Sequence, residues 1–401
     1  MLIVSKMPTS HNSNQQMFIP IRHFFNSSSS FFNATLVLKL MVTLFSIYIY
    51  ARVSPFIDAE KYLHSSFTSW DFSLLFKRTL FARNIYAGLK YILVYDILVH
   101  LFVSGLFVGV LVYVFKSEYN FLDKVLFTSS LLLPHFLIWS SVVGKEIMAL
   151  AGFFLLIKVC VDLTVWNKIR IIPLLTGLLL TTILRPHYAL AYLYLFSLSW
   201  IIAKSKIRVM GLFSSSASCL ILLGLMGYGL VLLFYFQQFY VDYLIHFMNE
   251  TQEYFLRFVQ SKGNRWDIDW EYAGDFVANL IWGIPISIIG PTWSEVLERP
   301  ILAPVFIEGC LALILLILIF CLLVRFVKIN PKYNSIIIWG FIPAVLLGIL
   351  INYPVGIFNP GSAVRYKQSL TPLLYFYPLL LIATIKRKKS IDAGLIVRTK
   401  Q

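Results

Sequence analysis

Four clusters of charged residues interrupt a chain that is otherwise mostly apolar. They are Asp58-Ala59-Glu60-Lys61, Lys145-Glu146, Arg185-Pro186-His187 and Arg365-Tyr366-Lys367. A carboxylate can accept a proton or bind a hard divalent cation, and the planar fork of an arginine matches the oxygens of a phosphate. Together, these residue types suit chemistry on a substrate that contains phosphate, so their relative positions decide whether they can act as one site.

The composition places these clusters in a membrane protein. Of the 401 residues, 59% are hydrophobic and 13% are charged, with a mean hydropathy of +0.78. A soluble domain carries roughly 25% charged residues, so we expect an all-α polytopic membrane protein. The net charge of +15 does not point to nucleic acid, because the basic residues are scattered over short loops rather than gathered on one domain.

About ten segments are long and apolar enough to be transmembrane helices, which need roughly 20 residues each. They cover residues 34–53, 91–115, 125–143, 146–164, 171–185, 188–203, 209–236, 300–325, 335–353 and 369–385. We expect residues 1–33 to be a disordered cytoplasmic lead-in, residues 34–385 to form the transmembrane domain, and residues 386–401 to be a basic cytoplasmic tail.

The basic loops determine the expected orientation. With both termini in the cytoplasm, every inner loop is basic, from Lys116 and Lys124 to the run Lys386-Arg387-Lys388-Lys389. This agrees with the rule that short cytoplasmic loops are rich in lysine and arginine. All four charged clusters then fall on the outer, periplasmic side of the plasma membrane, where cations are normally scarce. Cations on that side, beside carboxylates, indicate a site for an anionic lipid-linked substrate.

Two outer segments are long, residues 54–90 and 237–299. Within the first, residues 71–90 alternate apolar and basic side chains and predict an amphipathic helix in the membrane interface. The second is rich in tyrosine, tryptophan and acids, and its aromatic rings could stack on sugars. Its apolar piece, residues 276–289, contains Gly283-Ile284-Pro285 and predicts a re-entrant or interfacial segment rather than a span.

The acidic clusters also have simpler interpretations. Asp58 and Glu60 could be hydrated loop acids, and they converge only if the loop is extended, because alternate residues of a strand share a face. Lys145 and Glu146 could form an ion pair at the start of the next helix, where the helix dipole stabilises a carboxylate by about 0.3–1 kcal/mol. A charged pair at so tight a turn is costly unless it faces a polar cavity, which favours a functional role.

The cationic clusters have an alternative of the same kind. Arg185, Arg365 and Lys367 could extend to lipid headgroups, with Tyr366 as an interfacial aromatic residue. His187 alone is weak evidence for a catalytic site. Three cationic turns on one side are harder to explain as separate anchors than any one of them.

The chain resembles the GT-C glycosyltransferases, polytopic enzymes that use sugars linked to a polyprenyl phosphate. The resemblance is carried by Asp58-Ala59-Glu60 with Tyr62 in the first outer loop and by the amphipathic stretch that follows. Further runs are similar to membrane proteins of bacterial polysaccharide clusters, at residues 134–146, 184–186, 289–293 and 361–366. The acids are not adjacent as in many protein mannosyltransferases, and no large soluble domain follows the last span, so a lipid-linked glycan is the expected acceptor.

The residues and the resemblance together predict an inverting sugar transfer to a glycan or lipid-linked acceptor. Asp58 or Glu60 would be the general base and, if a divalent cation takes part, the ligands of Mg²⁺ or Mn²⁺. The remaining candidates would bind the phosphate or the rest of the substrate: Lys145, Glu146, Arg185, His187, Arg365, Tyr366 and Lys367. The polyprenyl phosphate or diphosphate donor, the glycan acceptor and membrane lipid are the expected partners.

Two alternatives remain open. A repeat-unit polymerase of O-antigen or capsule would also use outer arginines, but would tolerate loss of Asp58 and Glu60. A lipid-linked glycan flippase or another transporter would place its charges near the middle of the bilayer, and many transporters contain internal repeats, which are not apparent in this sequence.

Overall fold

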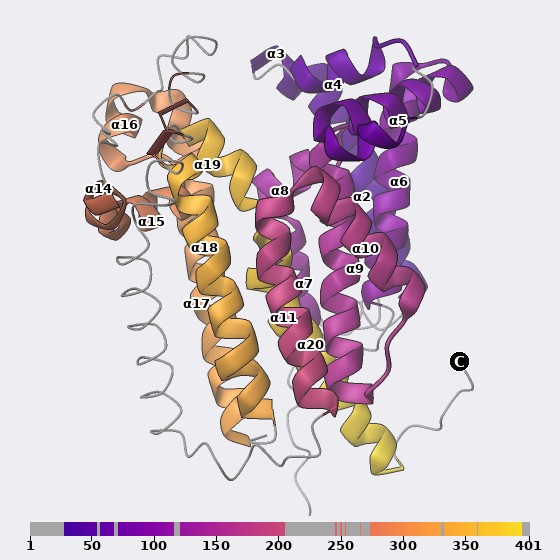
Figure 1. Ribbon diagram of the computed structural model, residues 1–401, viewed down its shortest axis with the longest axis vertical. Helices are drawn as coiled ribbons and strands as arrows, with labels where there is room; N and C mark the ends of the chain where they lie inside the picture. The colour runs from indigo at the N-terminus through magenta and orange to yellow at the C-terminus, as the bar shows by residue number, and fades with distance from the viewer. Residues whose placement is uncertain are drawn as a thin grey trace, which may run out of the picture.

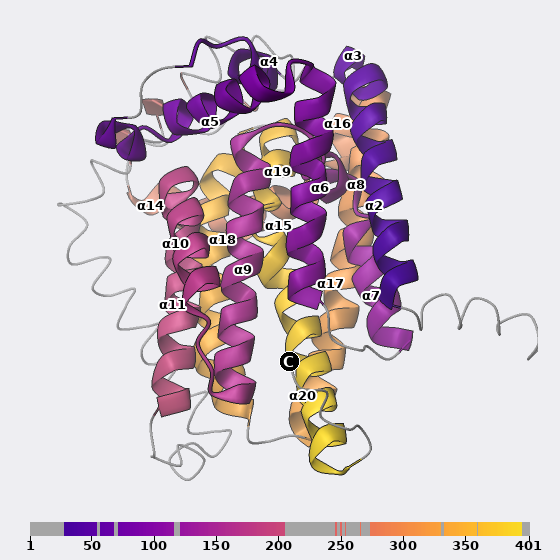
Figure 2. The ribbon, with the colours of Figure 1, turned by 90° about the vertical axis from the view of Figure 1, so that its right-hand side faces the viewer.

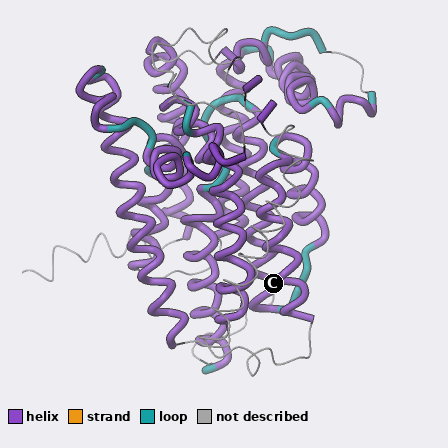
Figure 3. The backbone as a smooth tube through the Cα atoms, turned by 60° about the vertical axis from the view of Figure 1, so that its left-hand side comes forward, coloured by secondary structure: helices purple, strands orange, loops and turns teal. Residues whose placement is uncertain are grey.

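The computed structural model describes residues 28–53, 57–67, 71–115, 121–204, 273–329, 333–358 and 360–394, with the short pieces 245–246, 249–250, 253 and 265. Every regular element in these ranges is helical (Figure 3). Five helical stretches are long and apolar enough to cross a membrane: Asn33–Tyr50, Asp96–Phe115, Lys145–Trp166, Pro300–Ile329 and Ile336–Gly356. The all-α class is therefore confirmed for the described residues, and five of the ten expected spans meet this length and composition criterion there.

The first apolar run forms α2 (Ser28–Phe45), which continues through η2 (Ser46–Tyr50) into α3 (Ala51–Val53). The first outer segment then contains α4 (Ile57–Leu63), η3 (Phe72–Phe76) and α5 (Arg78–Leu93). Figure 2 shows α4 and α5 lying across one end of the bundle rather than along it. Helix α5 buries Phe81 and Tyr86 on one face and exposes Arg83 on another, as expected of an amphipathic interfacial helix.

The next predicted spans differ from the structure in two places. The run 91–115 becomes a span only from Asp96, as α6 (Asp96–Phe115), because the chain turns at Val94, which has a φ of 64°. The run 125–143 is divided into α7 (Phe121–Leu131) and α8 (Pro134–Trp139). Pro134 explains this division, since proline has no backbone N–H to continue a helix from the preceding turn.

Helix α9 (Lys145–Trp166) is at the centre of the bundle and packs against α6, α10 (Ile171–Leu184), α11 (Pro186–Lys204) and the C-terminal helix α20 (Tyr377–Asp392). Helices α9 and α10 approach each other closely. A Cβ added at Gly152 would lie 2.9 Å from the Cβ of Leu180 and 3.1 Å from the carbonyl oxygen of Gly177. Small residues at this crossing let the two backbones meet, which is how membrane helices commonly pack.

The C-terminal part of the chain places three short helices at the same end as α4 and α5. They are α14 (Ala273–Ala278), α15 (Leu280–Ile289) and α16 (Trp293–Glu298), followed by η4 (Pro300–Leu302) and the long α17 (Ala303–Ile329). Helix α15 contains Pro285 and packs against α17 and α18 (Ile342–Gly356). It is ten residues long, too short to span, in agreement with the expectation for residues 276–289.

The remaining elements complete the bundle. Helix α18 continues from η6 (Ile336–Phe341), and α19 (Pro360–Lys367) joins it to η7 (Pro372–Phe376) and α20. Figure 1 shows α4, α5, α16 and α19 at one end of the bundle and the end of α20, which carries the basic run 386–389, at the other. The predicted span 209–236, the lead-in up to residue 27 and the tryptophans at 266 and 270 lie outside the described residues.

Candidate functional site

Four of the predicted residues meet at the end of the bundle that carries α4 and α19. Asp58 comes from α4, Glu146 from the first turn of α9, Arg185 from the turn between α10 and α11, and Arg365 from α19. Arg365 Nη2 is hydrogen-bonded to the carboxylate of Asp58 and lies 2.8 Å from Glu146 Oε1. Arg185 Nη2 lies 2.6 Å from the same Glu146 oxygen. These contacts join residues up to 307 positions apart in the sequence into one ionic network.

Glu146 is the centre of this network. Its Oε1 accepts from Arg185 Nη2 at 2.6 Å and from Arg365 Nε at 3.0 Å, and its side chain is only 2% exposed. The turn before α9 makes room for it, because a Cβ at Gly144 would lie 2.8 Å from Glu146 Oε2. The same turn is held by Tyr86, whose hydroxyl donates to the Gly144 carbonyl oxygen at 2.7 Å. The glycine and the tyrosine therefore fix the carboxylate that both arginines share.

Aromatic rings cover both guanidinium groups. The Arg185 guanidinium carbon lies 4.7 Å from the centre of the Tyr366 ring, and that of Arg365 lies 5.2 Å from the centre of the Trp139 ring. Rings in these positions attract the cations and limit their movement. Burial opposes the charged form of Arg365, but the neighbouring Glu146 and Asp58 outweigh it and raise the pKa of the guanidinium above its usual value.

The two arginines differ in their access to solvent. The side chain of Arg185 is 3% exposed and Glu146 is its acidic partner, whereas Arg365 is 27% exposed and its second partner, Asp58, is 41% exposed. The contact between Arg365 and Asp58 is thus the open edge of the network. A substrate entering from the aqueous side would meet this pair first.

The site carries more positive than negative charge. Lys145 lies beside Glu146 without an ion pair to any described residue, and Arg185 and Arg365 add two further cations against the carboxylates of Asp58 and Glu146. With histidine counted as neutral, one positive charge is left over. The Nε of Arg185 is buried and has no hydrogen-bond partner among the described residues. The arrangement therefore has both the surplus charge and an unused donor for an anion.

Other predicted residues are placed differently. Glu60 is exposed, because residues 57–63 form a helix and positions two apart on a helix point in nearly opposite directions. Asp58 and Glu60 therefore do not form a paired ligand set for a divalent cation. Among the described residues, no group of three His, Cys, Asp or Glu side chains is placed to hold a metal ion.

The remaining candidates surround the network. His187 is half-buried, and its ring contacts that of Tyr188 in a tilted arrangement, with 4.7 Å between ring centres. It also lies within electrostatic reach of Arg185 and Lys145. Tyr366 covers Arg185, as described above. Tyr62, quoted from the first outer loop, is buried, and burial followed by the charges of Glu146 and Asp58 raises the pKa of its phenol above its usual value.

Lys367 belongs to a second, deeper ionic cluster. Its Nζ lies 3.9 Å from Oε1 of Glu308, which also accepts from the backbone N–H of His135 at 3.0 Å and contacts the His135 ring. The other ring nitrogen of His135 lies 3.2 Å from Thr371 Oγ1. Sequence reasoning did not single out Glu308. The available signal was an acid within an apolar run of membrane-spanning length, where ionisable residues are rare and usually paired.

No family model matches this chain, and neither the curated proteins nor the solved structures contain a match. Function is therefore inferred from the geometry and chemistry of the site itself.

Proposed function

We propose that the protein is a membrane-embedded glycosyltransferase that moves a sugar, with inversion, from a polyprenyl-phosphate donor to a glycan or lipid-linked acceptor. The observation that carries the proposal is the network of Asp58, Arg365, Glu146 and Arg185 at one end of an apolar helical bundle. It combines a solvent-accessible carboxylate with arginines and a surplus positive charge. The end of the bundle with this network would face the periplasm, and the basic end of α20 the cytoplasm.

The proposed reaction assigns one role to each group. The acceptor hydroxyl oxygen attacks the anomeric carbon, the bond from that carbon to the phosphate oxygen breaks, and Asp58 takes the hydroxyl proton. The lipid phosphate leaves with the bonding electrons, and Arg185, Arg365 and Lys145 offset its charge. Positioned cations of this kind contribute strongly to catalysis, and losing one typically costs roughly 10²–10³-fold in rate. Glu146 would act through the arginines, by holding both in place.

The contact between Asp58 and Arg365 fits this scheme. The contact holds the Asp58 carboxylate beside the cation that would bind the donor phosphate. When the donor phosphate arrives, Arg365 can exchange Asp58 for a phosphate oxygen, because both side chains are partly exposed. Release from the guanidinium would leave the Asp58 carboxylate free to contact the acceptor hydroxyl at the moment that the phosphate is bound.

The test compares Asp58→Asn with Glu60→Gln in the full-length protein, reconstituted in vesicles and supplied with a panel of polyprenyl-phosphate sugars. Release of polyprenyl phosphate and formation of glycosylated acceptor are measured. We expect Asp58→Asn to lower turnover by about 10²–10⁴-fold and Glu60→Gln to change it by less than about twofold. If the wild-type protein turns over no donor in the panel, or if Asp58→Asn retains full activity, this reaction is not the function.

A repeat-unit polymerase is the second candidate, and the arginines favour it. Arg185 and Arg365 are both hydrogen-bonded to the buried carboxylate of Glu146. Glu146 therefore has more hydrogen-bonding partners among the arginines than Asp58 has. Such an enzyme would need Arg185 and Arg365 to bind a lipid diphosphate but would keep activity in Asp58→Asn. Long glycan products from a lipid-diphosphate repeat unit, in the Asp58→Asn variant, would identify it.

A flippase or other transporter is the third candidate. It would move lipid-linked glycan across vesicles without consuming it, so measuring transport beside donor turnover separates it from both enzymes. Its charges are expected along a path through the middle of the membrane, whereas Asp58, Arg185 and Arg365 lie on elements at one end of the bundle (Figure 1).

A further inference from the structure

One side chain from the long segment between α11 and α14, Arg265, joins three parts of the chain at the end of the bundle that carries the site. Its Nε and Nη2 donate to the two carboxylate oxygens of Glu295, each at 2.8 Å. Its Nη1 donates to the carbonyl oxygen of Ile357 at 2.8 Å, and Nη2 also donates to that of Gly290 at 3.0 Å. Its backbone N–H donates to the carbonyl oxygen of Phe358 at 2.8 Å. We call this set of contacts the Arg265 clamp.

The clamp depends on the shape of the guanidinium group. All three nitrogens of the Arg265 guanidinium have partners, and the side chain is 12% exposed. A planar fork of five N–H donors can bind a carboxylate and two carbonyl oxygens at once, which a single ammonium group cannot do in fixed directions. The acceptors are themselves held in place. Glu295 also accepts from the backbone N–H of Thr292 at the start of α16, and Gly290 has a φ of 110°, which favours glycine.

The clamp lies next to α19. Residues 357–358, which it binds through two carbonyl oxygens, come shortly before the start of that helix. A Cβ added at Gly290 would lie 3.8 Å from Cγ2 of Val364, the residue before Arg365, and α19 packs against both α15 and α18. Two connections therefore lead from Arg265 to Arg365, one along the chain and one through packing.

Helix α19 needs such support because it is only eight residues long, and so short a helix is not stable by itself. Near its C-terminal end, the buried Lys367 lies with its Nζ 3.9 Å from Glu308 Oε1. The Arg265 clamp is at the other end of the helix. Arg365, which contacts Asp58, comes between these two attachments, so its position depends on both.

We propose that Arg265 is a positioning residue, whose clamp fixes the start of α19 and thereby places Arg365 against Asp58. Its effect on sugar transfer rests on the proposed function, whereas its effect on the placement of Arg365 does not. An arginine that only stabilised the fold as a whole would act equally on distant side chains. Arg170 is such a side chain, because it follows α9 and pairs with Asp162 at the opposite end of the bundle.

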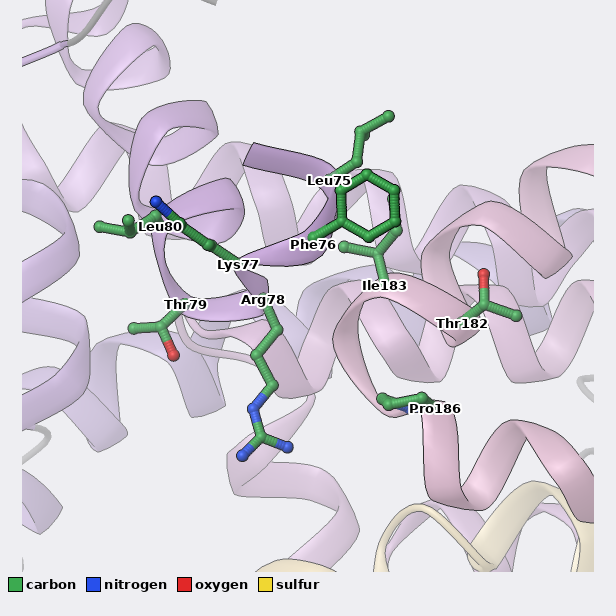
Figure 4. Close-up of a pocket in the computed structure, with 9 residues that line it drawn as sticks. All are labelled: Leu75, Phe76, Lys77, Arg78, Thr79, Leu80, Thr182, Ile183 and Pro186. Atoms are coloured by element: carbon green, nitrogen blue, oxygen red, sulfur yellow. The ribbon is translucent and has the colours of Figure 1, made fainter. Parts of the chain in front are cut away.

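The experiment measures how readily Arg365 reacts with phenylglyoxal, a reagent that modifies arginine side chains. The full-length protein is treated in nanodiscs, and the rate of modification at each arginine is followed by mass spectrometry. Arg78 is the reference for a freely accessible arginine, since it is exposed and lines an open pocket. Figure 4 shows its guanidinium group extending away from the other labelled side chains. Arg170 is the reference for an ion-paired arginine far from the clamp.

Arg265→Gln should raise the rate at Arg365, relative to Arg78, by about fivefold or more, and leave that at Arg170 within about twofold. Arg265→Lys should raise the rate at Arg365 by at least about threefold, because one ammonium group cannot replace the fork. Arg299→Gln removes a half-buried cation at the end of α16, outside the clamp, and should stay within about twofold of the wild type. An unchanged rate at Arg365 in either Arg265 variant, or an equal rise at Arg170, would overturn the proposal.

Steady-state kinetics extend the test to the proposed transfer. Because Arg365 would bind the donor phosphate, Arg265→Gln should raise KM for the donor by about fivefold or more and leave KM for the acceptor within about twofold. A smaller amount of folded protein would lower the measured turnover but would change neither KM, so this pattern separates positioning from simple destabilisation.

The outcome can be told apart from that of the proposed function. If Arg265→Gln makes Arg365 more reactive but the wild-type protein transfers no sugar, the positioning role stands and the transferase proposal fails. If the wild-type protein transfers sugar while Arg365 is equally reactive with and without Arg265, the transferase proposal stands and the positioning role fails.

Discussion

Replacing Glu146 by glutamine would remove the charge that both buried arginine contacts share. Glutamine is close to glutamate in size, so the packing around α9 is kept and the change is mainly electrostatic. In the variant, Arg365 still has Asp58, but Arg185 loses its acidic partner. The consequence therefore falls mainly on Arg185.

The size of the expected destabilisation follows from the burial of the Arg185 side chain. The Arg185 side chain is 3% exposed, so solvent cannot replace the lost carboxylate, and its Nε already lacks a partner among the described residues. Removing one member of a buried ion pair typically costs about 3–5 kcal/mol. We expect Glu146→Gln and Arg185→Gln each to lower the free energy of unfolding by about this amount. Arg365→Gln should cost less, because that side chain is 27% exposed and its partner Asp58 is 41% exposed.

The assay is a double-mutant cycle on the full-length protein in mixed micelles, with equilibrium unfolding followed by circular dichroism. The double variant Glu146→Gln/Arg185→Gln should be about as destabilised as either single variant, because neither charge is then left unpaired. Glu298→Gln, a surface change on α16, is the control and should stay within about 0.5 kcal/mol of the wild type. Additive losses in the double variant would show that Glu146 and Arg185 do not depend on each other, and would refute the network.

Two further predictions concern the α15–α16 region. In Gly283→Ala the new Cβ would lie 2.3 Å from Cε2 of Tyr353, so we expect the free energy of unfolding to fall by about 1–3 kcal/mol. Gly105→Ala is the control, because its new Cβ meets nothing within 4 Å, and it should be neutral or stabilising in the same unfolding assay. Burial opposes the ionised form of Glu295, but its hydrogen bonds to Arg265 outweigh this and lower the pKa of the carboxyl. The contribution of the ionised Glu295 to the free energy of unfolding should be complete above the unfolded-state pKa of about 4.3 and be lost as the pH falls through the lower folded value. The difference in stability between wild type and Glu295→Gln should therefore shrink in acid. A difference independent of pH would contradict this.

The sequence predicts that the distant charges lie on one side of the membrane. The positive-inside rule places Asp58, Glu146, Arg185 and Arg365 on one side of the membrane without any knowledge of packing. Lying on the same side of the membrane, however, does not bring two side chains into contact. That Arg185 and Arg365 use the same oxygen of Glu146 depends on how α9, α11 and α19 pack, and a hydropathy pattern contains no information on neighbouring helices.

The differences between expectation and structure have local causes. The pattern Asp58-Ala59-Glu60 predicts a pair of acids only on an extended loop, but residues 57–63 form a helix, which sends the two side chains apart. Hydropathy predicts one span over residues 125–143, because it averages over Pro134, which divides them. Glu308 lies outside the charged clusters, so the cluster pattern does not indicate it, although an acid within an apolar run is itself a signal.

The short helix α19 connects the two ionic clusters and suggests how the site could change partners without unfolding. Arg365 and Lys367 are two residues apart, so they point to different sides of the helix, one towards Asp58 and Glu146 and the other towards Glu308. If a phosphate drew Arg365 away from Asp58, the helix would still be held through the buried Lys367. Arg185 has no such freedom, because its acidic partner is the buried Glu146. We therefore expect Arg365 to be the arginine that moves to the substrate and Arg185 to be the one that stays in place.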